Sequence, residues 1–368
     1  MASSSAARVS GIAVYPGKPD SVHVVSVPAP VYGPDEVLIR IRDVGVCGTD
    51  KEIIDAKFGA PPPGTDELIL GHEAIGVVEE VGDDVASLRP GDLVAATVRR
   101  PDGCPACQAG QPDMCLWRNY TERGILFAHG FMIEQVVEHP DHLVKIPPEL
   151  AAIGVLLEPI SVVEKALRQA RLIQRRIAGW QPRTAVVLGA GPIGLLGTML
   201  LRAEGFEVHT LARSPAPTAA SKFVTSCGAH YVSTKETSYL ELAATLPNVD
   251  LIIEASSASA PVVDAMTLLG NNGVLVLLSL TGGDLRLDFP IDLINREFVL
   301  GNKVMVGSVN SAKEDFEHGA THLATFEKFW PGLTGSLITT RLPAFEHPQG
   351  IRDASVGGIK AVLEFDRT

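Results

Sequence analysis

The first 150 residues contain short apolar stretches that alternate with polar residues and end at proline or glycine. Residues 37–41 show this alternation, and residues 74–81 and 93–98 form similar short segments. A two-residue period is typical of a β-strand, and clusters of proline and glycine favour turns between strands. Residues from about 8 to 150 are therefore predicted to form mainly β-structure.

The pattern changes near Ala151, after which apolar strand-like stretches alternate with helical ones. A helix is predicted over residues 158–170, and Pro159 suits its first turn. A further helix is predicted at residues 195–204, with strands at residues 184–188, 207–211, 249–254 and 273–279. Strands that alternate with helices are typical of a parallel, doubly wound α/β sheet.

The length of the chain, 368 residues, exceeds that of one ordinary hydrophobic core, so two domains are expected. The change in pattern predicts a β-rich domain at residues 1–155 and an α/β domain at residues 156–308. Residues 309–368 contain further helix and strand segments, which are expected to pack back on the first domain.

The composition narrows the class of partner. A formal net charge of −12 argues against a nucleic-acid surface and favours a small-molecule substrate. No stretch approaches the ~20 apolar residues that a membrane span needs. Met1 to Arg8 lacks the apolar core of a signal peptide, so a cytoplasmic location without a membrane partner is expected.

Three residues of the β-rich domain are candidate metal ligands. Cys47 precedes His72 and Glu73 by about 25 residues, and each lies among glycines. A thiolate, an imidazole and a carboxylate are ligand types that zinc selects. Three protein ligands leave one position of a tetrahedral zinc open, which is typical of a catalytic site and not of a structural one.

A glycine-rich motif, Gly189-Ala190-Gly191-Pro192-Ile193-Gly194, follows the predicted strand at residues 184–188 and opens a helix. In this context the pattern predicts a dinucleotide site, because glycines let the pyrophosphate approach the helix N-terminus. Zinc and a nicotinamide cofactor together indicate oxidation of an alcohol by hydride transfer.

The end of the next strand indicates which dinucleotide binds. NAD enzymes tend to place an acidic residue there to bind the ribose 2′-hydroxyl, but this strand ends in Arg213 and Ser214. An arginine pairs well with a 2′-phosphate, and the serine can add a hydrogen bond. The sequence therefore predicts a preference for NADP, with NAD tolerated; a solvated Arg213 without influence is the alternative.

The chain resembles the zinc-dependent medium-chain dehydrogenase/reductase superfamily. Residues 71–85 match that family's zinc signature throughout, with Gly-His-Glu followed by two glycines and a valine at fixed spacing. The resemblance implies an N-terminal GroES-like β-barrel domain, a Rossmann nucleotide-binding domain and zinc between them. Within the superfamily it points to archaeal-type glucose 1-dehydrogenases, on the basis of Thr97–Arg100, Glu122, Gly130–Met132, Glu158-Pro159 and Gly307–Asn310.

Several residue roles follow from this resemblance. It implies that Cys47, His72 and Glu73 bind the catalytic zinc, with Glu158 as a further or exchanging ligand. Thr49 would begin a proton relay. Ser279, Ser308 and Asn310 are weaker candidates on the nicotinamide and substrate side. Dimers and tetramers are common among similar enzymes, so a homo-oligomer is expected.

A cluster of cysteines resembles the superfamily's structural zinc lobe, whose four cysteines are spaced C-x2-C-x2-C-x7-C. Cys104, Cys107 and Cys115 fit the last three positions, but the first falls on Pro101, which cannot bind metal. The neighbouring Asp102 could supply an oxygen ligand. The alternative is a loop that folds without metal and keeps three reduced cysteines.

The resemblance implies D-glucose as substrate, oxidised at C1 to the 1,5-lactone. Glu122, Glu158 and Asn310 match sugar-contacting positions. Some relatives have Asn, Asp and His where this chain has Val98, Val162 and Leu300, so galactose, xylose or another aldose stays open.

Two rival functions remain at this stage. One is a polyol or secondary-alcohol dehydrogenase of the same superfamily, which would not need Glu122. The other is a non-enzymatic NADP-binding protein, against which the intact Cys47, His72 and Glu73 argue.

Overall fold

The computed structural model describes residues 7–365 and divides into two compact units. The first unit comprises Met1–Ser161, Asn310–Leu323 and Gly335–Thr368; the second comprises Val162–Val309 and Ala324–Thr334. The expectation about targeting rested on Met1 to Arg8, most of which lies outside the described residues.

The first unit consists mainly of short strands. They are β1 (Arg8–Val14), β2 (His23–Pro28), β3 (Val37–Val46), β4 (Leu68–Ile69), β5 (Glu73–Val81), β6 (Leu93–Ala96), β7 (Arg99–Arg100), β8 (Thr121–Arg123), β9 (Phe127–Ala128), β10 (Gln135–Glu138), β11 (Leu143–Lys145), β18 (Ile338–Pro343) and β19 (Lys360–Glu364). Its helical segments are α1 (Gly48–Ile54), α2 (Pro105–Gln108), η1 (Pro112–Met114), η2 (Pro140–His142), η3 (Pro148–Leu150), η4 (Gly154–Leu156), η5 (Thr334–Leu337), of which Thr334 belongs to the second unit, and η6 (Pro348–Asp353).

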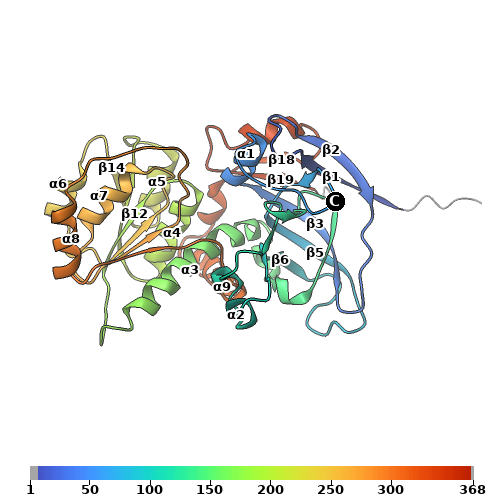
Figure 1. Ribbon diagram of the computed structural model, residues 1–368, viewed down its shortest axis with the longest axis horizontal. Helices are drawn as coiled ribbons and strands as arrows, with labels where there is room; N and C mark the ends of the chain where they lie inside the picture. Colours follow the sequence, from blue (N-terminus) through green and yellow to red (C-terminus); the bar gives the residue numbers. More distant parts are fainter. Residues whose placement is uncertain (1–6, 366–368) are drawn as a thin grey trace, which may run out of the picture. The chain divides into compact units, whose positions relative to one another are not determined.

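The main sheet of this unit has the order β11-β6-β5-β3-β19-β18, and β10 also pairs with β3. Strand β3 is central because its apolar residues face a buried core, with Val37, Ile39 and Ile41 almost fully covered. It pairs antiparallel with β5 on one side and with β19 on the other. Segments far apart in the sequence thus meet at the end of β3, where the candidate metal ligands begin (Figure 1).

The second unit contains a six-stranded parallel sheet of order β14-β13-β12-β15-β16-β17. Its strands are β12 (Thr184–Leu188), β13 (Glu207–Ala212), β14 (His230–Ser233), β15 (Leu251–Glu254), β16 (Val274–Leu277) and β17 (Val304–Gly307). Its helices are α4 (Pro192–Ala203), α5 (Ala219–Ser226), α6 (Tyr239–Thr245), α7 (Ala260–Leu268) and α8 (Ile291–Leu300). Two long helices, α3 (Leu157–Gln174) and α9 (Lys313–Phe329), contribute residues to both units.

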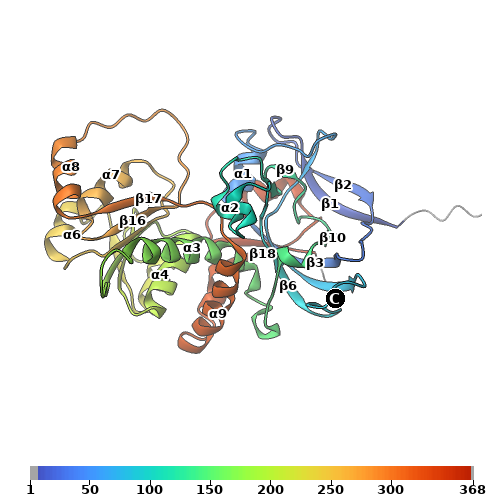
Figure 2. The ribbon, with the colours of Figure 1, turned by 60° about the horizontal axis from the view of Figure 1, so that its bottom comes forward.

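Helices cover both faces of this parallel sheet. Helices α4 and α5 contact strands β12 to β14, whereas α7 contacts β15 and β16 and packs against α6 (Figures 1 and 2). Buried apolar side chains from the strands and from α6 and α7 form the core between these layers. The predicted doubly wound parallel sheet is therefore confirmed.

Some predicted boundaries differ from the structure. Helix α4 begins at Pro192 and not at residue 195, because Gly191 provides the N-cap and proline suits the first helical position. Strand β6 ends at Ala96 and not at residue 98; Arg99 and Arg100 pair instead with β8 in a separate small sheet. This departure brings Arg99 opposite Glu122.

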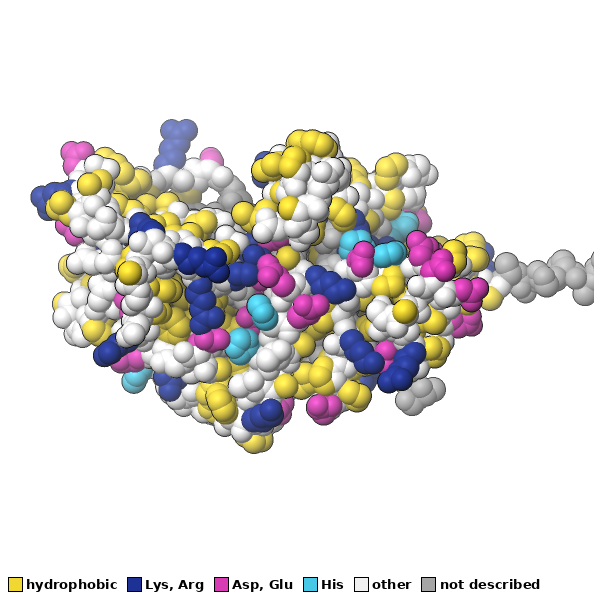
Figure 3. Space-filling model, turned by 90° about the horizontal axis from the view of Figure 1, so that it is seen from below, with side chains coloured by type: hydrophobic (Ala, Val, Ile, Leu, Met, Phe, Trp, Pro, Cys, Tyr) yellow, Lys and Arg dark blue, Asp and Glu magenta, His cyan; other side chains and the backbone are white. Residues whose placement is uncertain are grey.

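Among residues 7–365, no helix combines the length and the apolar character needed to cross a bilayer. On the face drawn in Figure 3, acidic and basic side chains are interspersed with apolar and uncharged ones.

Candidate active site

The three predicted metal ligands lie together in the first unit. One possible ligand atom from each of Cys47, His72 and Glu73 lies within 4.8 Å of the other two. Cys47 follows β3 and caps α1, and Glu73 begins β5 directly opposite Gly45 of β3. The antiparallel pairing of β3 with β5 therefore brings together residues that the sequence separates.

Polar atoms around this cluster lack hydrogen-bond partners. Within residues 7–365, buried atoms without a hydrogen-bond partner include Oδ1 of Asp50 and Nδ1 of His72. Burial lowers the pKa of His72, but the carboxylate of Asp50 and the thiolate of Cys47 outweigh burial and hold that pKa well above its usual value. The negative groups around His72 thus favour a positive charge at this cluster. The thiolate, imidazole and carboxylate of Cys47, His72 and Glu73 are ligands that suit zinc.

Lys360, which the sequence analysis missed, is the counter-charge of Glu73. It begins β19, is 2 % exposed, and its ammonium pairs with Oε2 of Glu73 and donates to the carbonyl of Val46 at 3.1 Å. Gly45 makes room for this pair, because a Cβ there would overlap the Glu73 carboxylate. A lysine at the start of the apolar run Ala361–Leu363 was the only signal in the sequence.

Glu158 and Thr49 lie close to the cluster without joining it. Glu158 stands in the first turn of α3, and burial above all raises its pKa to about 7; the positive charge of His72 opposes this rise, whereas the negative charge of Glu73 adds to it. Among the described residues it is not in the group of converging ligand atoms. The hydroxyl oxygen of Thr49 lies 3.8 Å from the sulfur of Cys47.

Glu122 and Asn310, predicted to contact the sugar, meet directly. The side-chain amide of Asn310 donates to Oε1 of Glu122 at 2.9 Å. Arg99 donates to the same oxygen from Nε at 3.1 Å and from Nη2 at 2.9 Å, and its guanidinium stacks on Tyr120. Glu122 is 7 % exposed, so it is a buried carboxylate and not a solvated surface one.

The cysteine lobe forms a second cluster of possible ligands. Asp102, Cys104, Cys107 and Cys115 bring one ligand atom each to within 4.8 Å of the others. The sulfurs of Cys104 and Cys115 are 3.9 Å apart, close to the roughly 3.8 Å edge of a tetrahedron with Zn–S bonds of about 2.3 Å. Asp102 accepts from the thiols of Cys115 at 2.9 Å and Cys107 at 3.4 Å, and it takes the place that Pro101 cannot fill.

The glycine loop of the second unit has the geometry of a phosphate cradle. Gly189 has a φ of +105°, and Gly194 packs so tightly that a Cβ would overlap the carbonyl of Gly189. At Gly191, the N-cap of α4, a Cβ would meet no other heavy atom within 4 Å. Pro192 and Ile193 begin the helix, and the free N–H groups of a helix's first turn are donors that suit a phosphate.

The other candidate cofactor residues lie at the carboxyl ends of the parallel strands. Arg213 and Ser214 are exposed after β13, and Ser279 follows β16 and donates to the buried Glu254 at 3.2 Å. Ser308 follows β17, and its buried hydroxyl has no hydrogen-bond partner in the described part of the chain. Carboxyl ends of parallel strands are where open α/β sheets bind their ligands.

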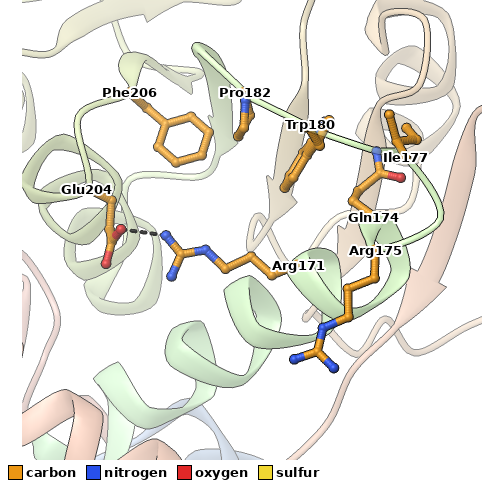
Figure 4. Close-up of a pocket in the computed structure, with 9 residues that line it drawn as sticks. Arg171, Gln174, Arg175, Ile177, Trp180, Pro182, Glu204 and Phe206 are labelled. Atoms are coloured by element: carbon orange, nitrogen blue, oxygen red, sulfur yellow. Dashed lines mark hydrogen bonds and ion pairs between the residues drawn. The ribbon is translucent and has the colours of Figure 1, made fainter.

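A separate pocket of about 460 Å³ lies elsewhere on the second unit, at the end of α3 and beside the start of β13 (Figure 4). Arg171, paired with Glu204, lines it together with Trp180 and Phe206. None of the predicted site residues lines this pocket, and it adjoins the amino ends of the strands, away from the glycine loop.

Comparison with known proteins agrees with this arrangement. Residues 33–148 match the alcohol dehydrogenase GroES-like domain, and residues 151–365 match the glucose dehydrogenase C-terminus. Glucose 1-dehydrogenase of Methanocella arvoryzae is 42% identical over 342 residues, covering 92% of this chain and 95% of that protein. Glucose 1-dehydrogenase 1 of Caldivirga maquilingensis is 39% identical over 357 residues, covering 96% and 98%.

A solved structure is similar over the same extent. Glucose dehydrogenase of Haloferax mediterranei, in complex with NADP, Zn and gluconolactone, is 35% identical and superposes with a TM-score of 0.88. The match covers 98% of this chain and 100% of the other. The resemblance inferred from the sequence is confirmed, and the chain belongs to the glucose dehydrogenase family of zinc-dependent medium-chain dehydrogenases.

Proposed function

We propose that this protein is a glucose 1-dehydrogenase that oxidises D-glucose at C1 to the 1,5-lactone and transfers the hydride to NADP, with NAD as a second acceptor. The convergence of Cys47 with the buried His72 and Glu73, in the same unit as the paired Glu122 and Asn310, is the observation that carries the proposal. Similarity to an enzyme solved with NADP, Zn and gluconolactone supports it.

Cys47, His72 and Glu73 would hold the catalytic zinc, with Glu158 as a further or exchanging ligand. When bound, zinc supplies a positive charge that lowers the pKa of a hydroxyl beside it. Lys360 fixes Glu73 through their buried ion pair, and Asp50 lies 3.7 Å from Nδ1 of His72, where it orients the ring. The hydroxyl of Thr49 both accepts and donates, so it can receive the substrate proton and pass it on.

Glu122 and Asn310 would bind the sugar. Arg99 and Asn310 both donate to Oε1 of Glu122, which leaves Oε2 to accept from a sugar hydroxyl. Because Arg99 and Asn310 already hold the carboxylate, little conformational freedom is lost on binding. The side chains of Val98, Val162 and Leu300 offer no polar partner to a sugar hydroxyl. Rates measured with different aldoses identify the sugar that this enzyme prefers.

Gly189, Gly191 and Gly194, with Pro192 and Ile193, would receive the pyrophosphate at the start of α4. Arg213 and Ser214 would bind the 2′-phosphate of NADP. Ser279, Ser308 and Asn310 would lie toward the nicotinamide and substrate. Asp102, Cys104, Cys107 and Cys115 would hold a structural zinc, to which Asp102 brings the fourth ligand atom.

We also propose a cytoplasmic homo-oligomer, a dimer or tetramer, that binds no nucleic acid. The net charge of −12 supports the last point. Light scattering coupled to size-exclusion chromatography measures the assembly directly.

The proposed activity is tested by initial rates of NADPH or NADH formation with zinc present, across aldoses, polyols and secondary alcohols. Activity on glucose or another aldose, without activity on sorbitol or isopropanol, is expected and places oxidation at C1. Activity on sorbitol or simple alcohols would replace the sugar proposal with a polyol or alcohol dehydrogenase. Bound zinc without turnover of any substrate would favour a non-enzymatic NADP-binding protein.

A further inference from the structure

A histidine pair on the second unit lies outside every site described above. His209 of β13 and His230 of β14 are direct partners in the parallel sheet, and their rings stack with centroids 4.7 Å apart and planes 18° apart. Glu207, two residues before His209, lies on the same face of β13. Its Oε1 lies 3.4 Å from Nε2 of His209 and 3.9 Å from Nε2 of His230.

The inner histidine has a buried nitrogen that faces this cluster. His209 is only 8 % exposed, and its Nε2 makes no hydrogen bond of normal geometry with any described residue, although Oε1 of Glu207 lies 3.4 Å away. A buried polar atom without a partner is costly, so it indicates a missing ligand.

The distances suit a first-row transition metal. Bonds of about 2.0–2.1 Å to nitrogen and oxygen place tetrahedral ligands about 3.3 Å apart. One ligand atom from each of the three residues already lies within 4.8 Å of the other two. His230 and Glu207 are well exposed, with side chains 60% and 53% accessible, so both can rotate toward the fixed ring of His209.

We propose that Glu207, His209 and His230 form an additional zinc site, with water as the fourth ligand. Two imidazoles and one carboxylate are a ligand set that zinc accepts. The site would join β14, the edge strand of the sheet, to its neighbour β13. The site lies at the amino end of β13, and His209 is about 13 Å along the strand from Arg213. Zinc bound at this site would therefore stabilise the sheet without entering the proposed cofactor site.

The test is calorimetric titration of Zn²⁺ into the full-length enzyme already loaded with zinc and freed of excess metal. One additional zinc per chain is expected to bind. Both His230→Gln and Glu207→Gln change exposed side chains, and each is expected to weaken this binding tenfold or more. His318→Gln, which changes an exposed histidine on α9, is the matched control and should bind the additional zinc like the wild type.

A second measurement reports on the same site without enzyme activity. Zinc that binds only the folded protein raises its unfolding temperature, and this extra rise should be present in the wild type and in His318→Gln but lost in His230→Gln. Cobalt offers a spectroscopic check, since a site without cysteine gives no sulfur-to-metal charge-transfer band. The proposal is overturned if the wild type binds no additional zinc or if His230→Gln binds it with unchanged affinity.

Discussion

Arg213 stands exposed at the end of β13, where an acidic residue would favour NAD. Replacing Arg213 with alanine removes a charge-assisted contact worth about 1.5–3 kcal/mol, so KM for NADP should rise about tenfold or more. KM for NAD should change little. Steady-state kinetics with each cofactor measures the difference, and an equal change in both would show that Arg213 does not select the 2′-phosphate.

Glu122 is the residue on which the sugar proposal depends most directly. Changing Glu122 to glutamine removes the charge that Arg99 and Asn310 hold in place, and kcat/KM for glucose should fall about 10- to 100-fold. NADPH affinity, measured by fluorescence titration, should not change. Glu149→Gln alters an exposed carboxylate of the same unit and should leave both quantities intact. Full activity of Glu122→Gln would remove Glu122 from the sugar site.

His142 makes stability depend on pH. Burial, reinforced by the charge of Arg100, lowers its pKa from 6.5 to about 4. Above pH 6.5 the ring is neutral in both folded and unfolded states, but between pH 6.5 and 4 only the unfolded chain takes up the proton, so stability falls as the pH falls. Between pH 6.5 and 4, the free energy of unfolding should fall less for His142→Asn than for the wild type. Denaturant titrations at several pH values measure this difference. Parallel curves for the two proteins would contradict this role.

At the residue scale, ligand residue types and the match of residues 71–85 to the zinc signature predicted Cys47, His72 and Glu73 as a group, and the structure brings these three together. The sequence did not identify Lys360 or Asp50. Lys360 reaches Glu73 only because β19 pairs with β3, and no local pattern encodes a contact between strands so far apart in the sequence. No local pattern marks Asp50, which the structure places in the first turn of α1.

Strand β10 ends at a buried carboxylate that connects two other strands. Glu138 accepts from Arg100 of β7 at 2.8 Å and pairs with Arg123 of β8 at 2.6 Å. Changing Glu138 to glutamine leaves two partly buried guanidinium groups without their buried counter-charge and should lower the free energy of unfolding by about 3 kcal/mol. Denaturant unfolding measures this loss.

The matched control is Glu79→Gln on β5, whose ion pair with Arg40 is far more exposed. Its cost should be no more than about 1 kcal/mol. Similar losses for the two variants would mean that burial does not set the strength of the Glu138 network.

At the scale of elements, the buried strand at residues 184–188 was predicted with its observed ends, since a continuous apolar run between turn residues is unambiguous. The strand predicted at residues 93–98 was too long. Its apolar pattern continues through Val98, but the chain leaves the main sheet after Ala96 and Arg99 pairs with β8. Tertiary pairing ended that strand, and local propensity gave no sign of it.

For the molecule as a whole, the proposed metal ligands and the proposed nucleotide loop lie in different units, and this separation can be tested. Cys47→Ala should abolish glucose oxidation while NADPH affinity stays nearly unchanged, because the glycine loop belongs to the second unit. Activity assays and NADPH fluorescence titrations on one preparation provide both values. Normal turnover would exclude Cys47 as a required zinc ligand, and a parallel loss of NADPH affinity would contradict the separation.

The class of fold was readable from the change in hydrophobic period near Ala151, from short β-type alternation to alternating strands and helices. The sequence did not show how the residues after 309 are divided between the two units. Helix α9 is continuous, yet residues up to Leu323 belong to the first unit and residues from Ala324 to the second. The sequence of α9 shows no break between Leu323 and Ala324. The boundary between the units depends instead on what each turn of the helix contacts.

The ion pair between Glu73 and Lys360 also bears on the order of events during synthesis. Val46 and Lys360 are 314 residues apart, so a nascent chain displays Cys47, His72 and Glu73 long before their lysine exists. Until β19 is made and added beside β3, Glu73 has no cation to share its buried position. Metal that arrives early would therefore meet a differently charged set of ligands, and the finished site is available only to a chain translated at least as far as residue 360.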